Sequence, residues 1–408
     1  MEIIRELCSF EGRLAGTDAE RRAADRVAER LRELGRKVEV EPTYVHPQYG
    51  LVHALHCLLG FAGSLVAIEL PALGFGLVLA AATSMYLDLN YRLYLVRSLF
   101  FRRASQNVVS RGGRADAPGR LIISAHIDAG RSGAVYAPKR ARRAARLRRR
   151  FPWLGPFRLL FGSLAALLPM LGARMAGVDS DAIAVLQLAP TLILLLGTFA
   201  LVEIELSPVV PGANDNASGV ATALSIAQEL ESEPTENLDV WFVLDGAEEG
   251  QQEGIRAFVR AHRKQLDRER TFFLSLESVG AGDVRYETAA GWVISYRTDR
   301  RLVALCEAIA AADAEGEGRF GAQPLRHASA GDSMPPLLAG FRSIGIGCLD
   351  GEDLVPQSHL PSDLPKAIDP EALDRAHDFT LELIRQLDRD VGRRSAARGG
   401  QAVIETSA

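Results

Sequence analysis

Two adjacent glutamates after a predicted strand are the first residues in this sequence that could do chemistry. Glu248 and Glu249 follow the largely apolar run 237–246, whose composition is typical of a buried β-strand. Two like charges at such a point indicate either a solvated loop or a proton-transferring carboxylate beside a metal-binding one. A general base must keep its carboxylate free to accept a proton, whereas a metal ligand cannot. The pair therefore offers two different roles to two neighbouring side chains.

Metal-type side chains occur at four more points of this kind. His126 and Glu277 each end an apolar run that is typical of a strand, Asp215 lies in a loop before a predicted helix, and His359 lies in a proline-rich loop. Open α/β sheets bind ligands at the carboxyl ends of their strands. Two histidines and three carboxylates can hold two divalent ions if one carboxylate bridges them, and such ligands suit Zn²⁺. Asp128, two residues after His126, is placed to accept the second imidazole N–H.

The elements that must position these side chains alternate between strands and helices. Strands are predicted at 37–45, 105–112, 119–128, 237–246, 271–280 and 341–350. Helices are predicted at 18–35, 218–233, 254–266, 299–313 and 369–389. This alternation predicts an α/β fold with a mostly parallel or mixed central sheet between helices.

Two pairs of long apolar segments interrupt this pattern. Residues 51–87 contain one acid, Glu69, and no lysine or arginine, and Pro71 follows closely. This composition predicts a transmembrane hairpin of two short helices. The segments 157–173 and 182–202 predict a second transmembrane hairpin. Four buried core helices are the alternative interpretation.

The hairpins divide the chain into a discontinuous domain and two insertions. The expected divisions are a discontinuous α/β domain at 1–50, 100–150 and 206–390, hairpins at 51–87 and 157–202, and a disordered tail at 391–408. Arg92, Arg97, Arg102, Arg103 and the basic run 139–150 all flank the hairpins on the side of the α/β domain. Because positive residues favour the cytoplasmic side, we expect an integral membrane protein with its catalytic domain in the cytoplasm. The basic run could also lie on anionic headgroups of the lipid bilayer.

Charge and cysteine content exclude two other classes. The formal net charge of the chain is −4, which argues against a nucleic-acid binder. The 4 cysteines are widely spaced and form no CxxC pair, so neither a disulfide framework nor a zinc knuckle is expected.

Taken in order, five motifs resemble those of the co-catalytic zinc exopeptidases of the bacterial leucyl aminopeptidase and aminopeptidase Y type. They are "AHID", "GANDNASG", "AEEGQQEG", "LESVG" and "HLPSDLPKAIDPEAL". The superfamily also includes glutamate carboxypeptidase, glutaminyl cyclase and the catalytically inactive transferrin receptor. The resemblance covers about residues 121–385, the segment 9–35 matches the family's N-terminal part, and only the apolar hairpins fall outside it.

The resemblance implies a ligand role for five residues and a three-layer αβα fold. Asp215 would bridge two zinc ions. His126 and Glu277 would complete one metal site, and Glu249 and His359 would complete the other.

It also implies roles for three residues that do not bind metal. Glu248 would be the general base of the reaction. Asp128 and Asp363 would hold catalytic and metal-binding groups in place.

Three departures from the family pattern bear on the site. The family more often has aspartate at position 277, although glutamate recurs in a membrane-bound branch that resembles the endoplasmic-reticulum metallopeptidases. The interval from His126 to Asp215 is long because the second hairpin lies within it. "EEGQQEG" lacks the Gly-Ser ending that is common after the glutamates, which is expected to reshape the pocket wall.

Further candidates carry weaker signals. Asp332 is either a pocket-wall residue or a turn residue, and His327 is a candidate for contact with substrate. His53 and His56 are spaced i, i+3 in the first apolar segment and are expected to be interfacial rather than ligands. His262 and His377 are expected on surface helices without a role.

The expected function is that of a membrane-anchored zinc aminopeptidase with two zinc ions and a peptide substrate. A zinc acyltransferase that resembles glutaminyl cyclase, with one zinc, is the first alternative. A carboxypeptidase or dipeptidase would need a cation in the pocket, for which Arg326 and Arg342 are candidates. A non-catalytic scaffold is the least favoured alternative, because no ligand position is lost.

Overall fold

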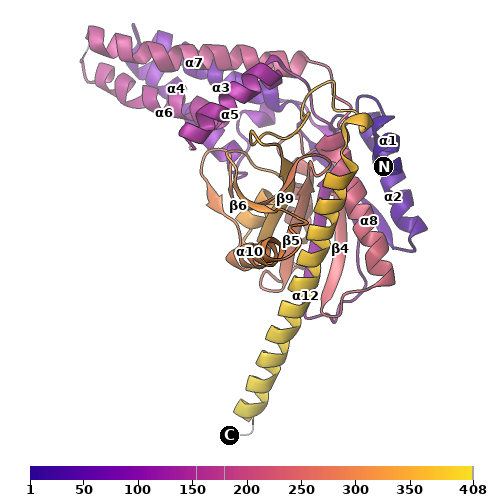
Figure 1. Cartoon of the computed structure of the whole chain (residues 1–408). Helices are drawn as coiled ribbons and strands as arrows, with labels where there is room; N and C mark the ends of the chain where they lie inside the picture. Colours follow the sequence, from indigo (N-terminus) through magenta and orange to yellow (C-terminus); the bar gives the residue numbers. More distant parts are fainter. Residues whose placement is uncertain (153, 179, 407–408) are drawn as a thin grey trace.

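A computed structural model describes residues 1–152, 154–178 and 180–406. Within these residues, nine strands form one mixed sheet in the order β1-β2-β4-β3-β5-β9-β6-β7, with β8 paired to β6 (Figure 1). The strands are β1 Val38–Val45, β2 Arg103–Ser110, β3 Gly119–His126, β4 Leu238–Asp245, β5 Thr271–Glu277, β6 Asp283–Ala290, β7 Tyr296–Arg297, β8 Gln323–Arg326 and β9 Arg342–Leu349. Strands β4, β3, β5 and β9 run parallel at the centre, and β1, β2 and β6 add antiparallel partners beside them.

Helices cover both faces of the sheet. One face carries α1 Glu2–Cys8, α2 Asp18–Glu33, α8 Ser218–Ser232, α10 Arg300–Glu315 and α12 Pro370–Thr406; the other carries α9 Glu253–His262 and α11 Met334–Leu338. Alternation along β3 explains this layering, since Leu121 and Ile123 face the first set while Ile122 faces the second. The expected α/β sandwich of three layers is confirmed.

Four apolar helices form a bundle that projects from one side of the sheet (Figure 1). They are α3 Tyr49–Val66, α4 Pro71–Leu89, α6 Pro156–Met175 and α7 Asp181–Leu206, and each is long and apolar enough to cross a membrane. In the bundle, α3 packs on α4 and α7, and α6 also packs on α4 and α7. Large apolar residues such as Val185, Leu196 and Phe199 are 65–70% exposed on α7, as expected of a lipid-facing surface.

A buried ionic contact fastens the first hairpin to the loop after β4. Arg97, in the short 3-10 helix η1 Arg97–Leu99, forms a salt bridge with Asp88 of α4, with a shortest distance of 2.8 Å. Its guanidinium also donates to the Gly250 carbonyl at 3.1 Å and to the Gln251 side chain. Because a buried arginine needs every donor satisfied, this cluster fixes the hairpin against the loop that carries Glu248.

The histidines of the first hairpin differ from expectation. His53 and His56 are fully buried, not interfacial. His53 Nε2 lies 2.9 Å from Gln251 Oε1, and His56 Nε2 lies 2.8 Å from Ser84 Oγ. Packing of α3 against the α/β domain and α4 takes both rings out of solvent, so they join elements together. His262 is also largely buried, because its ring contacts the Glu41 carboxylate at 2.9 Å.

The C-terminal segment differs as well. The predicted disordered tail at 391–408 is helical as far as Thr406, and residues 407–408 lie outside the described part. Val391 is buried against the core, and Arg394 pairs with Asp390 at 3.2 Å, which favours continuation of the helix. Strands β6, β7 and β8 were not predicted. Val284 and Tyr286 alternate with Arg285 and Glu287, and this period of two was the signal for β6.

Candidate active site

The predicted site residues meet at the carboxyl edge of the parallel strands. His126 and Glu277 are the last residues of β3 and β5. Glu248 and Glu249 follow the end of β4, and the loop after β9 brings in His359. Asp215 lies in a short helical turn, η3 Ala213–Ala217, which joins the second hairpin to α8. The structure thus gathers side chains that are separated by up to about half of the chain.

Three of these residues form a preorganised ligand set. Asp215, Glu249 and His359 offer ligand atoms that all lie within 4.8 Å of one another. His359 Nδ1 lies 2.8 Å from the Arg131 carbonyl, so an N–H there leaves Nε2 as the free ligand atom. The ring of Tyr136 stacks on His359 with a centroid distance of 4.3 Å and fixes its plane.

His126 offers a second nitrogen beside this set. Its Nε2 is buried without a hydrogen-bond partner among the described residues and lies 3.5 Å from Asp215 Oδ1. Its Nδ1 lies 3.2 Å from the Asp128 carbonyl and 3.5 Å from the Asp128 carboxylate. A proton on Nδ1 therefore leaves Nε2 unprotonated, with its lone pair facing a carboxylate. A divalent cation requires this arrangement of ligand atoms.

Glu277 is less closely gathered. It ends β5 near His126, but its carboxylate does not belong to the set of Asp215, Glu249 and His359. A Cβ placed on Gly331 would fall 1.9 Å from Glu277 Oε2, so the longer glutamate lies directly against that glycine. Only a residue without a side chain at position 331 leaves this space to Glu277.

Two buried aspartates hold the loops that carry the site. Asp128 accepts the backbone N–H groups of Glu248 at 3.1 Å and Glu249 at 3.0 Å. Asp363 accepts the N–H groups of Asn214 at 2.7 Å and Asp215 at 3.1 Å. These contacts fit the positioning roles expected of both residues.

Hydroxyl groups orient the Asp215 carboxylate. Ser278 donates to Oδ1 at 3.1 Å, and Ser358 donates to Oδ2 at 2.6 Å. Both oxygens are thus held in place, and Oδ1 also lies 3.5 Å from His126 Nε2. The peptide bond between Asp215 and Asn216 is cis.

The carboxyl groups have strongly perturbed protonation. Burial, reinforced by the charges of Glu277 and Glu249, raises the pKa of Glu248 well above its usual range. Burial likewise raises the pKa of Glu249 to about 7 and that of Glu277 to about 8. Burial also acts on Asp215, but the close contact with His126 and the charge of His359 outweigh it and lower the pKa of that carboxyl. Such crowding of buried acids is what a bound cation relieves.

The side chain of Gln252 connects Glu248 to the first hairpin. Gln252 Nε2 donates to Glu248 Oε1 and, at 3.0 Å, to the Ala330 carbonyl. In turn, the Tyr91 hydroxyl donates to Gln252 Oε1 at 2.5 Å, and the Trp292 indole N–H donates to the Tyr91 oxygen at 3.1 Å. These hydrogen bonds hold the Glu248 carboxyl group in one orientation. Sequence reasoning missed these residues, although the unusual "QQ" after the glutamates was the available signal.

Replacement of Gln252 by leucine should lower kcat and leave KM nearly unchanged. The substitution removes a donor to a buried carboxylate, a contact whose loss corresponds to a drop of about tenfold to a hundredfold. Steady-state kinetics with a peptide substrate measure this split. Tyr91→Phe should give a smaller loss in the same direction, and a Gln252→Leu protein with unaltered kcat would show that Glu248 needs no such support.

Gly130 approaches the ligand set closely. A Cβ at this position would lie 2.5 Å from Glu249 Oε1 and 2.5 Å from His359 Cε1. Gly130→Ala should therefore displace both ligands and weaken zinc binding by about tenfold or more, as disturbed ligand positioning does elsewhere. Competition with a chelating dye measures the affinity. Gly76→Ala on exposed α4 is the matched control, because nothing lies within 4 Å there, and equal affinities in both variants would contradict this geometry.

The remaining candidates divide into pocket and non-pocket residues. His327 lines the cavity described below, and burial lowers its pKa to about 4. Asp332 is buried next to Asp245 rather than in the cavity wall, and one of its carboxylate oxygens has no hydrogen-bond partner among the described residues. Arg326 and Arg342 do not line the cavity; Arg342 begins β9 at the opposite edge of the sheet.

A cavity of about 870 Å³ opens beside the ligand set. Asp215, Glu248, Glu249, Glu277 and His359 all contribute to its wall. Residues of α6, α7 and the basic helix α5 Pro138–Arg150 line its other side. A cavity of this size accommodates a ligand of a few residues.

Comparison with known proteins agrees with this site. Residues 199–384 match the model of Peptidase family M28. Aminopeptidase YwaD of Bacillus subtilis is 29% identical over 180 residues, a match that spans 43% of this chain and 38% of that relative. The part matched by the family model contains Asp215, both glutamates, Glu277 and His359.

Solved structures share the whole fold. The zinc aminopeptidase BSAP from Bacillus subtilis superposes with a TM-score of 0.54 at 15% identity, over 95% of this chain and 94% of that chain. Porphyromonas gingivalis glutaminyl cyclase superposes with a TM-score of 0.53 at 13% identity, over 95% of this chain and 96% of that chain. A Zn-dependent exopeptidase from Parabacteroides distasonis superposes with a TM-score of 0.52 at 14% identity, over 94% of this chain and 96% of that chain. The sequence match to Peptidase family M28 is confined to residues 199–384, and the fold is shared with zinc exopeptidases and glutaminyl cyclases.

Proposed function

We propose that the chain is a membrane-anchored, zinc-dependent aminopeptidase that hydrolyses the N-terminal peptide bond of peptides. The observation that carries this proposal is that the neighbouring residues Glu248 and Glu249 occupy different positions relative to the ligand set. Glu249 converges with Asp215 and His359 to within 4.8 Å, while Glu248 stays outside that set and faces the cavity. A ligand and a free base side by side are what hydrolysis by a metal-activated water requires.

The donor set fits two zinc ions. Asp215 has one carboxylate oxygen 3.5 Å from His126 Nε2 and also belongs to the close set with Glu249 and His359, so it would bridge two ions. Imidazole nitrogens and carboxylate oxygens are ordinary zinc ligands. When bound, zinc would lower the pKa of a water and polarise the scissile carbonyl.

The protein's own groups then move the proton. Glu248 accepts a proton from the attacking water and delivers it to the leaving amine as the C–N bond breaks. Gln252 holds the base in position, and Asp128 fixes the loop from which it projects. The acidic wall of the cavity also favours a substrate with a free, positively charged amine.

Reporter peptides test this proposal. The zinc-loaded protein in detergent should cleave an aminoacyl reporter with a free amine, and should cleave neither its N-acetylated form nor a carboxyl-terminal reporter at a comparable rate. Cleavage confined to the carboxyl-terminal reporter would replace the aminopeptidase by a carboxypeptidase.

One observation favours a second candidate, a zinc acyltransferase with a single metal ion. Only Asp215, Glu249 and His359 form a close ligand set in the described part of the chain, and Glu277 is not gathered with them. In addition, glutaminyl cyclases share the fold as fully as the aminopeptidases do. Such an enzyme would cyclise an N-terminal glutamine and release ammonia, with no hydrolytic water.

The membrane anchor has its own test. An epitope inserted at the α6–α7 turn, after Gly177, and a second one after the C-terminus should be accessible from opposite faces of the membrane, with the C-terminus in the cytoplasm. Protease protection in sealed vesicles measures this. Access to both epitopes from one face would contradict a bundle that crosses the bilayer.

A further inference from the structure

The cavity beside the ligand set continues into the apolar bundle. Its wall runs from Glu248 to Phe157 and Leu160 of α6 and to Leu196 and Leu201 of α7. Catalytic carboxylates and helices that are apolar enough to cross a membrane thus share one continuous space. A peptidase that acts on polar peptides would have no need of such a wall.

The lining residues of α6 and α7 differ widely in exposure. Phe157 is 8% and Leu201 6% exposed, whereas Leu159 is 40% and Leu196 67% exposed on the same two helices. The cavity wall therefore combines a buried inner part with an outer part that lies on the apolar surface of the bundle. In a membrane, that outer part faces lipid rather than water.

The inner apolar part lies next to the groups that hold Glu248. The Phe157 ring packs edge-on against Trp292 with a centroid distance of 5.2 Å. Trp292 belongs to the hydrogen-bond chain through Tyr91 and Gln252. An apolar side chain bound in the cavity against Phe157 would thus be separated by that ring alone from Trp292 and the hydrogen bonds that orient Glu248.

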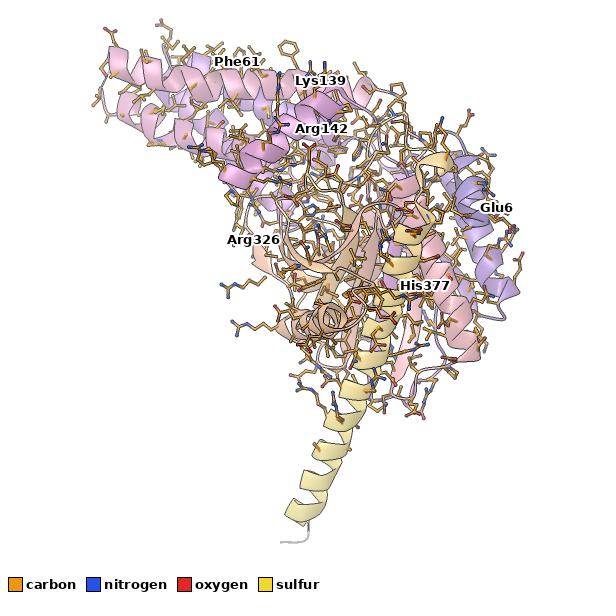
Figure 2. All side chains as sticks on the ribbon, in the orientation of Figure 1. Glu6, Phe61, Lys139, Arg142, Arg326 and His377 are labelled. Carbon is orange, nitrogen blue, oxygen red and sulfur yellow. The ribbon has the colours of Figure 1, made fainter. Side chains whose placement is uncertain are left out.

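Helix α5 adds a charged side to the same cavity. Ala141, Arg142, Ala144 and Arg148 line it from this helix, which lies alongside the bundle (Figure 2). Arg142 pairs with Glu352 at 2.9 Å and Arg149 pairs with Asp353 at 2.8 Å, whereas Arg148 has Asp353 as a neighbouring charge but forms no salt bridge among the described residues. Arg148 is therefore a cation available to an anionic group in the cavity.

We propose that the substrate is a short hydrophobic peptide with free termini, whose apolar side chains occupy the groove along α6 and α7. This inference rests on the proposed aminopeptidase function and names its substrate class. The peptide's amine lies at the carboxylate end, its side chains displace water from the apolar wall, and its carboxylate pairs with Arg148. The basic residue and the acidic end distinguish a peptide from an N-acylated lipid, which lacks the amine.

Two tetrapeptides test this inference in the full-length, zinc-loaded protein. Both begin with leucine, followed in one by three leucines and in the other by serine, glycine and serine. Wild type should cleave the apolar peptide with a kcat/KM at least about tenfold higher, because each buried apolar group contributes a factor of this order. Ala200→Phe, which fills the groove on α7, should reduce that preference severalfold.

Matched controls distinguish an effect of binding in the cavity from a general effect of detergent on activity. Ala184→Phe places the same ring on an exposed part of α7 outside the cavity and should keep the preference of wild type. If Ala200→Phe folds poorly, Arg148→Gln serves instead: it should lower activity on the free-acid apolar peptide about tenfold relative to its C-terminal amide.

Leucine anilide separates the two levels of the proposal. Suppose that the protein cleaves the anilide but cleaves both tetrapeptides at equal rates, or that Ala200→Phe keeps the preference of wild type. Either result would overturn the proposed binding of apolar side chains along α6 and α7 and would leave the proposed aminopeptidase activity standing. No cleavage of the anilide or of either peptide would contradict the proposed function itself. Faster cleavage of N-lauroyl-leucine than of the apolar peptide would replace the peptide by an acylated substrate.

Discussion

Replacement of Glu248 by glutamine should lower kcat by about 10²- to 10⁴-fold while zinc content and KM stay near those of wild type. Glutamine keeps the size of the side chain but cannot accept a proton. Its neighbour Glu249 belongs to the close ligand set, and Glu248 does not, so metal binding should be retained. Steady-state kinetics and elemental analysis of the same preparation measure both quantities.

A matched control is the exposed Glu236→Gln, which makes the same chemical change far from the cavity and should leave kcat unaltered. If Glu248→Gln instead loses zinc, Glu248 is a ligand. If it keeps full activity with bound zinc, another group moves the proton.

Replacement of Asp215 by alanine should remove all bound zinc and reduce hydrolysis to background. Asp215 lies 3.5 Å from His126 Nε2 and also belongs to the close ligand set with Glu249 and His359. Loss of His126 or His359 alone should remove one zinc ion and leave the other, because each belongs to one side only. Elemental analysis of the three alanine variants gives the stoichiometry directly.

Asp215→Asn guards against misfolding, since it preserves the side-chain shape that Ser278 and Ser358 contact. Thermal unfolding in detergent should show a folded protein in this variant. Wild type with a single zinc ion that depends on His359 and not on His126 would favour the single-metal acyltransferase instead.

Much of the site could be predicted because its side chains follow strong local patterns. The apolar runs that end at His126 and Glu277 form β3 and β5, and parallel pairing brings their ends to one edge. The ligand roles came from resemblance rather than from spacing, since no local signal states that Glu249 and not Glu248 should join His359. The loop that brings His359 to the ligand set also has no periodic pattern of apolar residues from which its course could be predicted.

What could not be predicted depends on contacts between distant elements. Strand β7 has two residues and β8 four, too few for a period to emerge, and both form only by pairing with β6. The burial of His53 required knowledge that α3 packs beside Gln251, nearly 200 residues away. The cavity along α6 and α7 likewise exists only once the second hairpin lies beside the sheet.

A single peptide that begins with glutamine and leucine distinguishes the proposed chemistry from its nearest alternative. The purified, zinc-loaded protein is incubated with it, and the products are identified by mass spectrometry. An aminopeptidase should release free glutamine and then free leucine, and Glu248→Gln should release neither. Formation of the pyroglutamyl peptide with loss of ammonia, and no free amino acid, would contradict hydrolysis of the N-terminal bond as the reaction of this site.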